Sequence, residues 1–255
     1  SNCIYFHYLS SIYQFFYNLK KTFCVVNQYV DFISDEHFKK CVKHVVDAYN
    51  KEFILEDKQL QKNGIDTIKM TFDMLCEEND FKKWKIKEST RQKDKTVNNA
   101  LGEFHQMLLG GVDGWTDLGA GDITKLDLKK NDNSIFMELK NKDNTVNADS
   151  SAKVREKLLV QIKKHNAIGY FAYFVATNGR SEELDWKSAN LENHKNLRRL
   201  SGTKVYEIVT GKHDALEQIW KALPSVLKDI HHITNPLSEN EKIEFKKWFK
   251  LAYNK

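Results

Sequence analysis

Glu138 and Lys140 stand two residues apart in a short run whose side chains alternate in polarity. Because successive residues of a β-strand point to opposite faces, the pattern predicts a strand with Glu138 and Lys140 on one face. The opposite face carries the apolar residues Ile135, Met137 and Leu139. The strand would therefore bring a carboxylate and an ammonium group side by side.

A second alternating run, Lys125–Lys130, precedes this strand and predicts its antiparallel neighbour. The connecting residues 131–134 are of types that tolerate tight turns, and a turn centred on Asp132-Asn133 places Asp127 opposite Glu138. A shift of one residue would mix apolar and polar faces, so the pattern specifies the register. The same register pairs aliphatic residues on the buried face, Leu126 with Leu139 and Leu128 with Met137.

Two carboxylates held side by side raise each other's pKa unless a cation lies between them. A divalent ion bound by hard oxygen ligands, Mg²⁺ above all, suits the pair Asp127 and Glu138. Lys140 would then orient an attacking water and offset charge that grows on a phosphate. The residues alone also allow a surface hairpin that carries a cluster of charges.

Other acidic residues are candidates for the same site. A helix predicted over Arg91–Leu109 has an apolar stripe, and Glu103 and Gln106 lie on the neighbouring polar face. Glu103 is the candidate for a third carboxylate. In the glycine-rich loop that follows, Asp113, Asp117 and Asp122 each rival Asp127 as a metal ligand. The spacing of His37, Cys41 and His44 on a predicted helix is compatible with a metal, but the adjacent apolar stripe favours an ordinary helix face.

The segment after the hairpin is rich in side chains that donate and accept hydrogen bonds, which suits contacts with phosphates or base edges. The alternative is a turn followed by a helix N-cap at Asp149 or Ser150, with the helix running to His165. The basic residues of that helix, and those of the segment 186–199, also suit a nucleic acid. The candidate DNA-binding residues are Asn141, Lys142, Asn144, Thr145 and Asn147.

The remaining pattern predicts elements that support the hairpin. The apolar run Tyr170–Ala176 indicates a strand buried on both faces. The other predicted elements are helices over Ser34–Glu52, Ile65–Leu75, Asp214–Leu227 and Glu239–Tyr253, a basic turn at residues 82–85, and a strand over Lys204–Val209.

Composition indicates a globular protein with one main domain. The chain has 255 residues, 41% of them hydrophobic, and a net charge of +5 that permits a polyanionic partner. Residues 1–30 form a predicted amphipathic, aromatic N-terminal extension, and residues 31–255 form the domain. The extension fits neither a membrane span nor a signal peptide. The four cysteines form no C-x-x-C pair, which favours reduced thiols and a cytoplasmic location.

The order of a helix with Glu103, a strand with Asp127 and a strand with Glu138-x-Lys140 resembles the PD-(D/E)XK nuclease superfamily. A more specific resemblance covers most of residues 31–255. The strings Gly102–Gln106 and Glu138–Lys142, with Asn144-Thr145 after the second, are similar to a family of type II restriction endonucleases that cut GGNCC or GGWCC sites. The sequence departs from the superfamily pattern in having Leu126, not Pro, before Asp127.

The resemblance implies an α/β fold with a central mixed β-sheet flanked by helices. It further implies that Asp127 and Glu138 hold Mg²⁺, that Lys140 assists the attacking water and that Glu103 supports the site. The expected partners are double-stranded DNA, a second copy of the chain in a homodimer that matches a palindromic site, and a cognate DNA methyltransferase as a functional, not physical, partner. The alternatives are a repair or recombination nuclease, a non-catalytic DNA-binding module on the same scaffold, and a glycoside hydrolase, which would give Lys140 no role.

Overall fold

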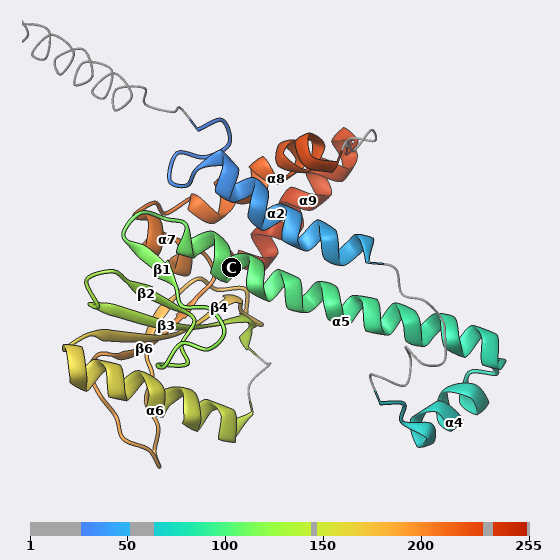
Figure 1. The fold of residues 1–255 in the computed structure, drawn as a ribbon, viewed down its shortest axis with the longest axis horizontal. Helices are drawn as coiled ribbons and strands as arrows, with labels where there is room; N and C mark the ends of the chain where they lie inside the picture. The colour runs from blue at the N-terminus through green and yellow to red at the C-terminus, as the bar shows by residue number, and fades with distance from the viewer. Residues whose placement is uncertain (1–26, 52–63, 144–146, 232–236, 254–255) are drawn as a thin grey trace, which may run out of the picture.

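The computed structural model describes residues 27–51, 64–143, 147–231 and 237–253, which build a six-stranded sheet (Figure 1). Three central strands run parallel, and the strands toward both edges pair antiparallel. This mixed sheet with flanking helices confirms the expected α/β fold class. In their order across the sheet, the strands are β1 (Trp115–Asp117), β2 (Leu128–Lys130), β3 (Ile135–Lys142), β4 (Ile168–Val175), β6 (Leu197–Ser201) and β5 (Glu183–Asp185).

Helices cover both faces of the sheet (Figure 1). One face packs against α6, which connects β3 to β4, and the other packs against α5 and α7, with α2 and α8 behind them. The helices are α2 (Asp35–Asn50), α4 (Thr67–Cys76), α5 (Phe81–Gly110), α6 (Ala148–His165), α7 (Thr203–Thr210), α8 (Ala215–His231) and α9 (Glu239–Tyr253).

The two faces of the central strands belong to different hydrophobic clusters. Met137 and Phe174 pack with residues of α5, α7 and α8. Phe136 and Phe171 pack with Leu158 and its neighbours on α6. Since successive residues alternate between faces, β4 is buried on both sides, as its nearly continuous apolar run predicts.

Some helix boundaries agree with the sequence pattern, and others differ. Ser34, the first residue of the predicted helix, is the N-cap of α2, and its hydroxyl accepts a hydrogen bond from the His37 N–H at 3.2 Å. Helix α9 has the predicted bounds. The basic turn predicted at residues 82–85 is wrong, because these residues lie in the first turns of α5. The side chain of Asp80 accepts from the Lys83 N–H at 2.8 Å and starts that helix earlier than its apolar stripe indicates.

The strand predicted at Lys204–Val209 is also wrong, because the segment forms α7. A short apolar run fits the periods of a strand and of a helix equally well, and length alone does not decide between them. Gly202 and Gly211 flank the segment with φ values of +58° and +74°, which separate it from β6 and end it as a short helix. Its buried residues are Val205, Tyr206 and Val209.

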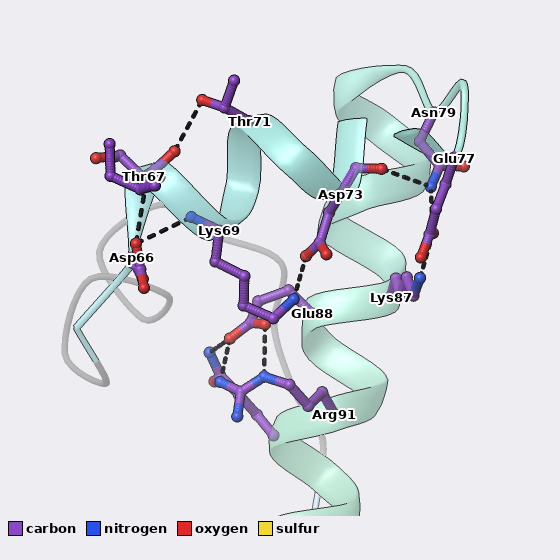
Figure 2. A network of polar contacts seen from close by, with 12 residues as sticks. Asp66, Thr67, Lys69, Thr71, Asp73, Glu77, Asn79, Lys87, Glu88 and Arg91 are labelled. Atoms are coloured by element: carbon purple, nitrogen blue, oxygen red, sulfur yellow. Dashed lines mark hydrogen bonds and ion pairs between the residues drawn. The ribbon is translucent and has the colours of Figure 1, made fainter. Parts of the chain in front are cut away.

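Polar contacts, rather than a shared core, hold α4 beside α5 (Figure 2). None of the residues of α4 is buried. An ion pair between Glu77 and Lys87 joins the C-terminal end of α4 to α5, and Lys69 pairs with Asp73 within α4. Since exposed ion pairs contribute little to stability, α4 adds little to the free energy of unfolding.

Most of the predicted N-terminal extension, residues 1–26, lies outside the described residues. The part that follows packs on the domain, since Val30 is buried in the larger cluster and the Asp35 carboxylate accepts from the Gln28 N–H at 2.8 Å. The division at residue 30 stays a prediction. Among the helices in the described ranges, none combines the length and the apolar character needed to cross a bilayer.

Candidate active site

The hairpin of β2 and β3 has the predicted register. Leu128 pairs with Met137 and Lys129 with Phe136, and Asn133 adopts a left-handed conformation with φ +58° in the turn. Leu126 is the exception. It packs in the cluster beneath α6 instead of facing Leu139, because the regular ladder begins only at Leu128.

Asp127 lies directly before β2, and its backbone is fixed from both sides. Its N–H donates to the Met137 carbonyl at 3.1 Å, and its carbonyl accepts from the Leu118 N–H at 2.9 Å. The carboxylate accepts from the Leu139 N–H at 2.6 Å. Burial, and then the charge of Glu138, raise the pKa of the Asp127 carboxyl, while the Leu139 N–H and nearby lysines oppose that rise.

Glu138 is a buried carboxylate with only one oxygen satisfied. The residue is 6% exposed, and its Oε1 accepts from Lys140 Nζ at 2.7 Å. Its Oε2 is buried and has no hydrogen-bond partner, although Lys157 Nζ lies 3.7 Å away. A buried carboxylate oxygen without a donor is costly, and such an atom in a folded protein points to an ion or water that belongs there.

Lys157 reaches this cluster from α6, the crossover helix that connects β3 to β4. Its ammonium donates to the Lys125 carbonyl at 2.8 Å and faces Glu138. The sequence grouped Lys157 with the basic residues of this helix, which suit a phosphate backbone or a solvated helix face. Arg155 is not displayed to solvent at all, because it is 2% exposed. Its Nη1 donates to the Trp186 carbonyl and its Nη2 to the Glu192 carbonyl, each at 2.7 Å.

Helix α5 reaches the site through Gln106. Its side-chain amide donates to Asp117 Oδ1 at 2.6 Å and to the Asp127 carbonyl at 3.3 Å. Gly110 allows the end of α5 to come this close, because a Cβ there would lie 2.4 Å from the Asp117 Cβ. The sequence placed Gln106 on the polar face of α5 but gave no signal that it would contact Asp127.

The structure does not join Glu103 to Asp127, Glu138 or Lys140 by any hydrogen bond or ion pair in its described part. The Glu103 side chain is 61% exposed and pairs with His44 of α2 at 2.7 Å. His37 has different partners: its Nε2 donates to the Met107 carbonyl at 2.8 Å and lies 3.4 Å from Cys41 Sγ. Within the described ranges, no group of three or more His, Cys, Asp or Glu residues is arranged to hold a metal ion.

Asp122, the alternative metal ligand, forms its hydrogen bonds within a local turn. Its Oδ1 accepts from the Thr124 N–H at 2.8 Å and from the Thr124 hydroxyl at 2.5 Å, and these hydrogen bonds lower the pKa of its carboxyl. No hydrogen bond or ion pair among the described residues links it to Glu138. The geometry favours Asp127 over Asp122 as the carboxylate beside Glu138.

The candidate DNA-binding residues fall at the end of β3 and the start of α6. Asn141 is partly buried and Lys142 is exposed on the last residues of β3, whereas Asn144 and Thr145 lie outside the described residues. Asn147 is the N-cap of α6, where its side chain accepts from the Ser150 N–H at 2.9 Å. The N-cap predicted at Asp149 or Ser150 is therefore wrong, because α6 starts earlier and those residues form its first turn.

These side chains suit a divalent metal ion. Glu138 Oε2 offers a buried lone pair without a donor, and burial, followed by the charge of Glu138, raises the pKa of the Asp127 carboxyl. A cation between the two would relieve both costs, and oxygen ligands of this kind suit Mg²⁺. Asp127, Glu138 and Lys140 on a mixed α/β sheet match the arrangement that the resemblance to the PD-(D/E)XK nuclease class implies.

Comparison with known proteins places the chain in one family of that class. The model of the Eco47II restriction endonuclease family matches residues 30–232, and this chain belongs to that family. The type II restriction enzyme Sau96I of Staphylococcus aureus is 34% identical over 217 residues, which cover 80% of this chain and 82% of that enzyme. The type II restriction enzyme Eco47II of Escherichia coli is 32% identical over 244 residues, 88% of this chain and 98% of that enzyme. The expectation of a type II restriction endonuclease is confirmed, and the family implies a divalent metal.

Proposed function

We propose that this protein is a Mg²⁺-dependent endodeoxyribonuclease that hydrolyses phosphodiester bonds of double-stranded DNA at a short, G·C-rich palindromic site in the cytoplasm. The observation that carries the proposal is the buried, donor-free Oε2 of Glu138 beside a second carboxyl, Asp127, whose pKa is raised. The names of the two relatives, both type II restriction enzymes, support site-specific cleavage.

Asp127 and Glu138 would hold the metal ion. When bound, Mg²⁺ supplies positive charge to a phosphoryl oxygen and makes water more acidic. The Leu139 N–H fixes the Asp127 carboxylate, and Lys140 fixes Oε1 of Glu138, so each acid is oriented before DNA arrives. Lys140 is about one third exposed, so its ammonium can also donate to the attacking water and to the phosphate.

Lys157 and the segment that follows β3 would support the two acids in different ways. Lys157 holds the Lys125 carbonyl and offsets the negative charge of Glu138. We assign the segment after β3 to contacts with the DNA. Its residues Asn141, Lys142, Asn144, Thr145 and Asn147 follow the strand that carries Glu138 and Lys140, so DNA at the acids would pass close to them.

A homodimer is part of the proposal, because a two-fold symmetric site is most simply bound and cut by two copies related by the same symmetry. A cognate DNA methyltransferase would protect the host sites and would be a functional partner only.

Digestion of mixed-sequence plasmid DNA with Mg²⁺ tests the function. We expect a fixed set of discrete fragments, their loss when a chelator removes the metal, and their return when Mg²⁺ is restored. Random nicking would instead indicate a repair or recombination nuclease. Specific binding by a folded, metal-loaded sample that leaves the DNA intact would indicate a non-catalytic module.

Glu103→Gln separates a supporting role from a ligand role. Glu103 lies one helical turn before Gln106, which contacts the Asp127 carbonyl, but its own partner is His44. We therefore expect a modest loss of cleavage rate, about tenfold, at the lower end of the losses typical of outer-shell residues. The measurement is the initial rate of plasmid cleavage over a range of Mg²⁺ concentrations. A loss as large as that of a direct ligand would place Glu103 on the metal.

A further inference from the structure

We propose that Arg199 binds a DNA phosphate adjacent to the one that is cleaved, an inference that rests on the proposed function. Arg199 lies on β6, two strands away from the strand that carries Glu138. In the parallel ladders, Glu138 stands beside Phe171, and Phe171 stands beside Arg199. Residues aligned in this way point to the same face, so Arg199 and the two acids share one side of the sheet.

The guanidinium of Arg199 is directed toward the end of the sheet where the parallel strands finish. It lies 5.2 Å from the ring centroid of Tyr173 and 6.0 Å from that of Phe171. Tyr173 is the ladder neighbour of Lys140. The rings of Phe171 and Tyr173 therefore hold the guanidinium at the level of Lys140 along the strands. The backbone of β6 lies two strands, or about 10 Å, from that of β3.

The donors of Arg199 are not used by the rest of the described chain. No hydrogen bond or ion pair of Arg199 occurs there, and its Nε is buried without a partner. The carboxylate of Asp143 attracts Arg199 electrostatically but makes no hydrogen bond with it, and it accepts from both the N–H and the hydroxyl of Thr177. The two terminal nitrogens of the guanidinium therefore remain for a ligand, and a guanidinium that is held by rings suits bidentate contact of these nitrogens with a phosphate.

The neighbouring arginine of the same strand provides a matched contrast. Arg198 points to the opposite face, where its Nε lies 2.6 Å from Glu183 Oε1 and its Nη1 lies 3.3 Å from Asp185 Oδ1. Its charge is neutralised within the protein. Of these two adjacent residues of one type, only Arg199 has both the location and the donors to bind DNA near Glu138 and Lys140.

The test is DNA binding as a function of salt concentration. Duplex plasmid DNA of mixed sequence is bound without divalent metal, so that cleavage does not compete, by the wild type, Arg199→Ala, Arg199→Gln, Arg199→Lys and the control Arg198→Ala. We expect Arg199→Ala to weaken binding roughly 10- to 100-fold, as for loss of one charge-assisted hydrogen-bonded contact. The slope of log K against log salt should become shallower by about one. Arg199→Lys should retain the slope and only part of the affinity.

Arg199→Gln keeps a long side chain over the rings without the charge, so it replaces Arg199→Ala if that variant does not fold. Wild-type slope and affinity in the neutral variants would overturn the inference and leave the nuclease proposal intact. Equal losses in Arg198→Ala and Arg199→Ala would also overturn it, because any surface charge would then serve. A reduced slope in an enzyme that never cuts plasmid DNA would support the Arg199 contact and reject the nuclease function.

Discussion

Replacing Glu138 with glutamine should lower the rate of DNA cleavage by at least about 100-fold, beyond the upper end of the loss typical of an outer-shell partner. The change keeps the size of the side chain and removes the charge that holds both Lys140 and the proposed metal ion. An amide oxygen is a weaker ligand than a carboxylate, so a higher Mg²⁺ concentration should restore only part of the rate. The measurement is the initial rate of plasmid cleavage against Mg²⁺ concentration.

Glu192→Gln is the matched control. The Glu192 side chain is exposed and forms an ion pair with Lys163 at 2.8 Å, not with the residues of the candidate site. The Glu192→Gln variant should therefore cleave at nearly the wild-type rate. Thermal unfolding of both variants checks that the fold is kept. Cleavage by folded Glu138→Gln within a few-fold of wild type would remove Glu138 from the catalytic site.

The register of the hairpin could be predicted because it depends on local pattern. Alternation fixed which residues share a face, and the turn types fixed where the chain reverses, so Leu128 meets Met137 as expected. The same reasoning failed one residue beyond the ladder. Leu126 turns to the other face because Lys125, with φ +54°, bends the chain before the strand begins.

The contacts made by Lys157, Gln106 and Arg199 could not be predicted from local pattern. Each depends on how a helix or a distant strand docks on the sheet. The sequence marks the basic residues of α6 and of segment 186–199 as suited to a nucleic acid, but it does not place any of them beside Glu138. Lys157 reaches Glu138 only because α6 packs across β3 and β4, and Arg199 joins the row of Glu138 only through the ladder order β3–β4–β6. Long-range pairings of this kind leave no periodic signal near the residues that they bring together.

The strand expected at Lys204–Val209 failed for a different reason. The run is short, and its apolar residues satisfy both a two-residue and a helical period, so local pattern leaves the element undecided. The tertiary environment decides, because Tyr206 is fully buried against His105 and Phe174 only when the segment is helical.

Acid should destabilise the protein through His105. Its ring stacks on Phe174 with centroids 3.9 Å apart, and its Nδ1 lies 2.7 Å from the Tyr206 hydroxyl. Burial lowers the pKa of His105 to about 3, from the ordinary value of 6.5. Between these two pH values the unfolded chain binds a proton that the folded chain does not, so the free energy of unfolding falls as the pH falls below 6.5.

From pH 7 to pH 5 we expect this group to remove about 1 to 2 kcal/mol of stability, at up to about 1.4 kcal/mol for each pH unit. Denaturant unfolding at several pH values measures it. In the His105→Asn variant, an amide replaces the imidazole near Tyr206 and takes up no proton over this pH range. The variant should be less stable than the wild type at pH 7, but its free energy of unfolding should fall less steeply as the pH falls. The exposed His213 gives the control, since His213→Asn should retain the wild-type slope. Equal slopes for the wild type and His105→Asn would show that His105 takes up its proton equally well in the folded protein.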